Sequence, residues 1–211
     1  TRFRNVTGVQ TCALPISTFI CNSDRSGIMA GHFNKLYDAN RSTAIGGSGN
    51  RLFYSDNSGI FEGRRNLINN NSNNSTILGG CCNEQNQACG STILGGCFNC
   101  ISCNQNSIIA GGMDNCISGY NYLGYLYTNC SNSILGGRCN TICETDYSAI
   151  VGGCYNTICT EGDNFNSIVG GRYNTICSST DFSVIIGGCG NKIASYGADA
   201  DYSVKIGRAH V

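Results

Sequence analysis

The chain has 211 residues, and its 13 basic and 13 acidic side chains give a formal net charge of zero at pH 7. Without a basic stripe, nucleic-acid binding through phosphate neutralisation is disfavoured. No apolar run approaches the roughly 18 residues of a membrane-spanning helix, so we expect neither a nucleic-acid partner nor a membrane span.

The two ends of the chain differ from the rest. Residues 6–17 (VTGVQTCALPIS) and 205–211 (KIGRAHV) resemble translated sequencing-adapter sequence, as found at the ends of reading frames from assembled metagenomic reads. Such segments are excluded from fold reasoning. We expect residues 1–17 and 205–211 to be non-native, residues 18–204 to form one repeat domain, and the natural chain to continue in both directions.

An eleven-residue phrase, S-x-I-x-G-G-x-x-N-x-I, recurs ten times between the two ends. The copies are Ser26–Leu36, Ser42–Leu52, Ser58–Ile68, Ser75–Gln85, Ser91–Ile101, Ser107–Ile117, Asn132–Ile142, Ser148–Ile158, Asn166–Ile176 and Ser183–Ile193. A fixed phrase at a short period is typical of a repeat architecture. With steps of 16 to 18 residues and one of 25, it predicts an all-β fold: a β-solenoid of about ten coils. Coils stacked in parallel at ~4.8 Å would form a rod roughly 48 Å long.

Two positions of the phrase are candidates for the core. The third is Ile in nine copies, with Ala44 as the exception, and the eleventh is Ile or Leu in nine, with Gln85 as the exception. Burying each such side chain contributes roughly 1.5–3 kcal/mol. We expect both positions to point into the coil.

The ninth and sixth positions are constant and indicate corners. Gly fills the sixth position in every copy, as expected where the chain turns sharply or backbones approach closely. Asn tolerates the left-handed conformation and bonds local backbone, and stacked Asn side chains form ladders. A structural turn ladder is therefore expected, with ligand binding as the alternative. It comprises Asn34, Asn50, Asn66, Asn83, Asn99, Asn115, Asn140, Asn156, Asn174 and Asn191.

The fourth position is apolar in every copy. It holds Met29, Ile45, Phe61, Leu78, Leu94, Ala110, Leu135, Val151, Val169 and Ile186. Adjacent strand residues point to opposite faces, so an inward third position places this row outside as a long apolar stripe. The pattern predicts a homo-oligomer packed along the row. The alternative is a wider coil with both rows inside.

The repeat resembles a known family of surface proteins. Ser148–Ile158 (SAIVGGCYNTI) and Asn166–Ile176 (NSIVGGRYNTI) resemble the head repeats of trimeric autotransporter adhesins, and are similar to Gly-Gly/Asn repeats in the shafts of phage and large-virus tail fibres. The resemblance covers residues 26–193 and implies a left-handed β-roll, a trimer, and a structural or adhesive role on a virion or cell surface. The longer period and the many cysteines depart from the adhesin pattern.

Sixteen cysteines follow the repeat. Stacked equivalents would lie ~4.8 Å apart with parallel Cβ vectors, whereas disulfides need Cβ atoms about 3.5–4.5 Å apart. We therefore expect reduced thiols acting as small hydrophobes, while an oxidising setting leaves pairs such as Cys81 with Cys97 open. Cys97, Cys100 and Cys103 have iron–sulfur-like spacing without an evident fourth ligand, so we predict no metal and no cofactor.

No catalytic set stands out, and we expect no enzyme. His32 is the one histidine between the two ends, which disfavours Ser-His-Asp or Cys-His chemistry. The alternative is a carbohydrate-active, depolymerase-like solenoid using paired carboxylates. Its candidates are Asp146, Glu161, Asp163 and Asp181. A weaker alternative, ice binding, needs a regular row of Thr, and only Thr141, Thr157 and Thr175 supply one.

The step of 25 residues contains Tyr120, Tyr122, Tyr125 and Tyr127. Tyr is favoured at interfaces and loops on rigid scaffolds carry function, so these residues are candidates for contact with a glycan or cell-surface receptor. Equally, the tyrosines could pack on the rod as a bulged coil. The sequence as a whole favours a non-catalytic structural or adhesive fibre segment.

Overall fold

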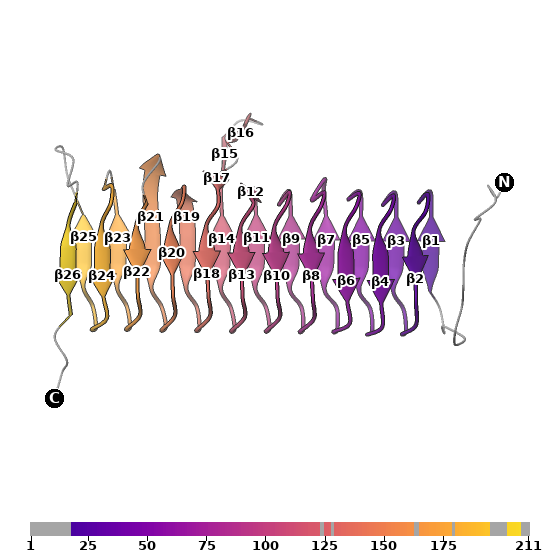
Figure 1. Ribbon diagram of the computed structural model, residues 1–211, viewed down its shortest axis with the longest axis horizontal. Coiled ribbons are helices and arrows are strands. Elements are labelled where there is room, and N and C mark those ends of the chain that lie inside the picture. The colour runs from indigo at the N-terminus through magenta and orange to yellow at the C-terminus, as the bar shows by residue number, and fades with distance from the viewer. Residues whose placement is uncertain are drawn as a thin grey trace.

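Short β-strands follow one another along the whole rod in the computed structural model, which describes residues 18–122, 125–127, 129–162, 165–178, 180–194 and 202–207. These residues contain no helix. The strands sort into two eleven-stranded parallel sheets that face each other (Figure 1). The chain is therefore an all-β solenoid of about ten coils, as the repeat predicts.

Each coil contributes one strand to each sheet. Sheet 1 comprises β1 (Phe19–Cys21), β3 (Lys35–Tyr37), β5 (Arg51–Phe53), β7 (Leu67–Asn69), β9 (Glu84–Asn86), β11 (Cys100–Ser102), β14 (Cys116–Ser118), β19 (Thr141–Thr145), β21 (Thr157–Gly162), β23 (Thr175–Cys177) and β25 (Lys192–Ala194). Sheet 2 comprises β2 (Gly27–Ile28), β4 (Thr43–Ile45), β6 (Gly59–Phe61), β8 (Thr76–Ile77), β10 (Thr92–Ile93), β13 (Ile108–Ile109), β18 (Ser133–Ile134), β20 (Ala149–Ile150), β22 (Ser167–Ile168), β24 (Val184–Ile186) and β26 (Val204–Ile206).

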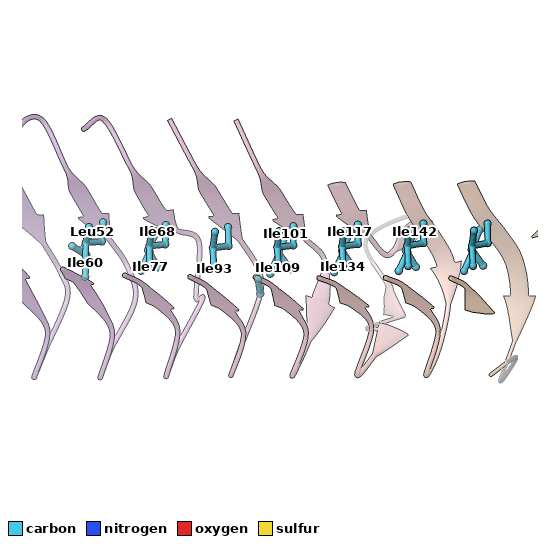
Figure 2. Close-up of a cluster of buried hydrophobic side chains, with 14 of the residues drawn as sticks. Leu52, Ile60, Ile68, Ile77, Ile93, Ile101, Ile109, Ile117, Ile134 and Ile142 are labelled. Atoms are coloured by element: carbon cyan, nitrogen blue, oxygen red, sulfur yellow. The ribbon is translucent and has the colours of Figure 1, made fainter. Parts of the chain in front are cut away.

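The core consists of two columns of aliphatic side chains, one from each sheet. Strands pair in register with their equivalents one coil later, for example Ile101 with Ile117 and Ile93 with Ile109. Figure 2 shows the eleventh-position residues of sheet 1 meeting the third-position residues of sheet 2. Both positions are buried along the rod, which confirms the predicted core.

Gln85 interrupts the sheet 1 column. Its side chain is fully buried, and Nε2 donates a 3.4 Å hydrogen bond to the Thr76 carbonyl. Oε1 has no hydrogen-bond partner. An unpaired buried acceptor loses its hydration without compensation, so this coil is a weak point of the rod.

The asparagine column occupies one corner, between the end of each sheet 2 strand and the next sheet 1 strand. Asn115 is representative: its Nδ2 donates to the carbonyls of Gly111 (3.0 Å) and Gly137 (3.1 Å). Its Oδ1 accepts the backbone N–H of Asn140 at 3.0 Å, and its own N–H donates to Asn99 Oδ1 at 3.1 Å. The side-chain amide therefore links backbone groups of its own coil and the next one, and the Asn99 side chain pairs the backbone N–H of Asn115 in the same way.

The same N–H to Oδ1 bond joins every neighbouring pair of the ten asparagines. Its lengths are 3.0–3.1 Å from Asn50 through to Asn191. In these bonds a backbone N–H donates to a side-chain oxygen, whereas the sequence suggested bonds between side chains. Backbone groups at a corner cannot pair within a sheet, and the buried amide satisfies them instead.

The expected left-handed conformation lies one residue before the asparagine. Every eighth-position residue has a positive φ, whereas none of the ten asparagines does. The eighth-position residues are Phe33, Gly49, Arg65, Cys82, Phe98, Asp114, Cys139, Tyr155, Tyr173 and Gly190. The asparagine side chain has to enter the coil, so the reversal falls on the residue before it.

Glycine is required at the sixth position for two reasons, its positive φ and the lack of space for a Cβ. Gly112 has a φ of +88°, and a Cβ there would lie 2.2 Å from the Gly137 carbonyl oxygen and 2.6 Å from Asn115 Nδ2. The neighbouring Gly111 has no heavy atom within 4 Å of such a Cβ. Only the second glycine of the pair is therefore needed for the corner itself.

A second polar column, to which the sequence pattern assigned no role, closes the opposite corner. Ser42 Oγ donates to the Ser55 carbonyl (2.9 Å) and accepts the backbone N–H of Ser58 (3.1 Å). Ser26, Ser58 and Ser91 repeat this arrangement in their own coils. Where Asn132 and Asn166 replace serine, their longer amides reach the Thr145 and Thr180 carbonyls at 2.6 and 2.7 Å.

The long step of 25 residues is accommodated outside the two sheets. β15 (Tyr120–Tyr122) and β16 (Tyr125–Tyr127) form an antiparallel hairpin that stands beyond the strand ends of the two sheets in Figure 1. β17 (Asn129–Cys130) then pairs in parallel with β12 (Asn104–Gln105). The coils on either side keep their register, because β14 pairs directly with β19.

The rod extends slightly past the expected boundary at residue 204. Lys205 and Ile206 belong to β26, where they pair with Ile185 and Ile186 of β24. Residues 1–17 and 208–211 lie outside the described residues. The adapter origin of both ends stays a prediction.

The two adjacent glycines of one coil provide a matched test of the corner. We expect Gly112→Ala to lower the free energy of unfolding by on the order of 2–4 kcal/mol, through backbone strain and overlap with the next coil. Gly111→Ala should change it by less than about 1 kcal/mol, since space is open there. Urea unfolding followed by circular dichroism measures both, and equal effects would contradict the assignment.

The buried glutamine gives a prediction of opposite sign. Gln85→Ile restores the aliphatic column and removes an unpaired acceptor, so we expect about 1–3 kcal/mol of stabilisation. Gln85→Glu, of nearly the same shape, should destabilise because it buries a carboxylate. Denaturation midpoints of the two variants check this, and an unchanged or lower midpoint for Gln85→Ile would refute it.

Candidate assembly surface

The fourth-position side chains lie outside the coil, as the alternation of strand residues requires. Leu135 is 53% exposed, Val151 43% and Val169 45%, while the neighbouring third-position Ile134, Ile150 and Ile168 are fully buried. The alternative of a wider coil enclosing both rows is therefore wrong. The row runs along the outer side of sheet 2 for the length of the rod.

The second position shares this outer surface and is also uncharged. It holds Gly27, Thr43, Gly59, Thr76, Thr92, Ile108, Ser133, Ala149, Ser167 and Val184. We call the second and fourth positions of the ten coils the apolar face. None of its residues carries a charge. The outer surface of sheet 1, by contrast, carries Lys35, Arg51, Glu84 and Lys192.

Glycines border the apolar face. A Cβ added at any of the fifth-position residues Gly95, Gly111, Gly136, Gly152 and Gly170 would meet no heavy atom within 4 Å, so the backbone there is open. Small residues let another backbone approach closely. Beside the projecting fourth-position side chains, these glycines therefore leave a strip of surface from which no side chain projects.

The four candidate tyrosines belong to the hairpin outside the sheets. Tyr120 lies opposite Tyr127, and Tyr122 lies opposite Tyr125. The backbone arrangement matches the extruded alternative rather than a bulged coil. Their side chains lie outside the described residues, so a role in partner binding stays a prediction.

An aromatic column, not predicted from the sequence, runs along the C-terminal coils. Tyr147, Phe165, Phe182 and Tyr202 stack with ring centroids 4.9, 5.3 and 5.1 Å apart and nearly parallel planes. Each ring directly precedes the first position of a coil or, for Tyr202, Ser203. The recurrence of an aromatic residue at this position in consecutive coils is a signal in the sequence that could have predicted the column. Stacked aromatic pairs contribute about 0.5–1.5 kcal/mol each beyond burial, so the column reinforces these coils.

The cysteine prediction needs a correction. Cys143 and Cys159, on adjacent coils, form a disulfide with a Cα–Cα distance of 4.7 Å. That distance lies within the range of about 4.4–6.8 Å that disulfides accept, so stacking in register does not prevent bridging. The other twelve cysteines with described side chains are free, including Cys81 and Cys97.

Two of the free cysteines interact through their thiols. Cys100 and Cys116 lie opposite each other in sheet 1. The hydrogen bond between their thiols raises the pKa of Cys100, aided by burial, and lowers the pKa of Cys116 against the effect of burial.

The structure does not bring together the described carboxylates of the depolymerase-like alternative, and it limits the threonine row of the ice-binding alternative. Asp146 and Asp181 each lie two residues before the first position of a coil, two coils apart, while Asp163 and the Glu161 side chain lie outside the described residues. Thr141, Thr157 and Thr175 stack in register between Cys116 and Lys192, which limits the Thr row to three rungs.

Metal ligands do not gather in the described part of the chain: no three His, Cys, Asp or Glu side chains there lie close enough to hold an ion. Cys97, Cys100 and Cys103 are thus not brought together as a ligand set. Among the described residues there is also no helix with the length and hydropathy to cross a bilayer.

No protein-family model matches the sequence, and no curated protein matches it. The fold alone defines the class of this chain, which is that of a β-solenoid repeat protein.

Proposed function

We propose that the protein is a non-catalytic structural or adhesive fibre segment whose chains associate side by side through the apolar face, as a trimer. The observation that carries this proposal is the absence of charge from twenty stacked outward positions on sheet 2. The resemblance of the repeat to adhesin heads and viral tail-fibre shafts supports a place on a virion or cell surface.

Removing the apolar face from water favours assembly of the chains. Covering the face removes apolar side chains from water at about 25 cal/mol per Å², and no charged group has to lose its hydration. Parallel sheets are usually covered on both faces, and sheet 2 is covered on its inner side only. Three copies related by a three-fold axis could each turn the same face toward that axis.

The buried polar residues support a structural rather than a chemical role for the repeat. The amide of Asn115 and the hydroxyl of Ser42 are buried and occupied by backbone partners. Such groups hold coils together and are not accessible to a substrate. The hairpin of Tyr120, Tyr122, Tyr125 and Tyr127 is the proposed contact for a glycan or receptor.

Molar mass in solution tests the assembly. Light scattering coupled to size-exclusion chromatography should give three times the chain mass of 22.3 kDa. The double variant Leu94→Glu and Leu135→Glu places charge on the apolar face, at side chains that are 42% and 53% exposed in the single chain. We expect it to be monomeric and still folded.

A control variant carries the same charge on the other sheet. Thr141→Glu and Thr157→Glu lie on the outer side of sheet 1 and should leave the mass unchanged. A monomeric wild-type chain, or equal dissociation of both double variants, would contradict assembly through the apolar face.

A further inference from the structure

A shallow hollow of about 380 Å³ lies beside the asparagine corner, on the N-terminal coils. It is lined mainly by Phe33, Ser48, Gly49, Arg51, Arg64 and Arg65. The hollow has a simple origin in the sequence. His32, Ser48 and Arg64 stack in register at the seventh position, so the small pair Ser48-Gly49 leaves a gap between His32-Phe33 and Arg64-Arg65.

Three guanidinium groups surround this gap without carboxylate partners. Arg51, Arg64 and Arg65 are exposed, and none forms an ion pair within the described part of the chain. The neighbouring acidic residues are Glu62, two residues before Arg64, and Glu84, beyond Leu67 in the tenth-position column. Neither lies within ion-pair distance of the three arginines. On a chain with zero net charge, this is a local concentration of unpaired cations.

The chemistry of the lining points to an oxyanion carried on a small organic body. Guanidinium groups bind carboxylate, sulfate and phosphate oxygens through paired charge-assisted hydrogen bonds. Phe33 is 55% exposed and offers an apolar surface beside them. A volume of about 380 Å³ falls in the range typical of small-molecule sites. A bare anion would use the arginines but not the aromatic ring.

We propose that this hollow binds an acidic saccharide, with a carboxylate or sulfate group held by the arginines and the apolar side of the sugar ring against Phe33. The proposal deepens the adhesive part of the proposed function and rests on it for its biological sense. Binding itself requires one chain only. The hollow lies at the asparagine corner, separate from the second and fourth positions that make the apolar face.

Nuclear magnetic resonance titration of the full chain tests the site. We expect glucuronate and glucose 6-sulfate to shift the Nε–Hε signals of the arginines and the amide of Gly49 in a saturable way. Neutral glucose should cause much smaller shifts, because it lacks the anion. Affinity should fall as sodium chloride is added, since exposed charges are screened.

Substitutions distinguish binding in the hollow from non-specific attraction of the anion to positive charge. Arg64→Gln and Arg65→Gln should each weaken binding at least about tenfold, as expected for loss of a charge-assisted hydrogen bond. Arg138→Gln is the matched control, because Arg138 is also an exposed seventh-position residue but stacks between Met113 and Cys154. It should leave binding unchanged.

Filling the hollow tests its shape while all three arginines remain. Eight of the ten eighth-position residues carry a side chain at positive φ, so Gly49→Tyr is compatible with the fold. A Cβ at Gly49 meets only Arg65 Cγ, at 3.6 Å. We expect this variant to stay folded, with a small loss of stability from the left-handed conformation, and to lose saturable saccharide binding.

Four results would overturn the proposal: no saturable shift with either acidic sugar, equal weakening by Arg138→Gln, unaltered binding by Gly49→Tyr, or inorganic sulfate binding as tightly as glucose 6-sulfate. A single-stranded oligonucleotide that displaces the sugar at lower concentration would reassign the site to nucleic acid. The Leu94→Glu and Leu135→Glu double variant should keep saccharide binding, so a failure of assembly and a failure of this site are distinguishable.

Discussion

The rod depends on one interaction, the hydrogen bonding of a buried asparagine amide to the backbone of its own and the adjacent coils. A solenoid turns its chain twice per coil, and each turn leaves backbone N–H and C=O groups that no sheet can pair. Leaving such groups buried and unpaired costs on the order of 1–3 kcal/mol each. The side-chain amide of Asn115 alone pairs three of them, the carbonyls of Gly111 and Gly137 and the N–H of Asn140.

This interaction explains the neighbouring positions of the repeat. The amide lies against the sixth-position glycine, where a Cβ would come within 2.6 Å of Asn115 Nδ2, so no larger residue fits. The turn is made by the eighth residue in the left-handed conformation, which leaves the asparagine free to point inward. The tenth to twelfth residues then enter sheet 1 with the eleventh side chain in the core. Three features of the repeat thus follow from one buried group.

Much of this could be predicted from the sequence, because the relevant constraints are local and periodic. The period, the inward third and eleventh positions and the outward fourth position all follow from strand alternation. Other features depend on distances between coils that no periodicity reveals. The side chain–backbone bonding of Asn115, the serine column at Ser42 and the Cys143–Cys159 disulfide belong to this group. The hollow at Gly49 arises only because larger neighbours stack on either side of it.

The repeat distinguishes residues that the fold requires from outward-facing residues that it does not. The residues of the hydrogen-bonded columns recur in every coil, whereas the outward-facing residues are free to vary. Two features of the outer surface are not explained by the repeat itself. The apolar face of sheet 2 is uncharged along its length, and the N-terminal coils gather unpaired arginines beside Phe33. The first supports lateral assembly, and the second supports recognition of an acidic sugar. A shaft that both assembles and binds would need these two surfaces to be distinct, as they are on this rod.

Amide hydrogen exchange tests the central claim most directly. The backbone N–H of each asparagine from Asn50 to Asn191 donates to the preceding asparagine's Oδ1, although it lies at a corner. The account predicts that these amides exchange as slowly as sheet amides such as Cys100, which donates to the Asn115 carbonyl at 2.9 Å. Rapid exchange of the asparagine amides, with the sheet amides still protected, would contradict it.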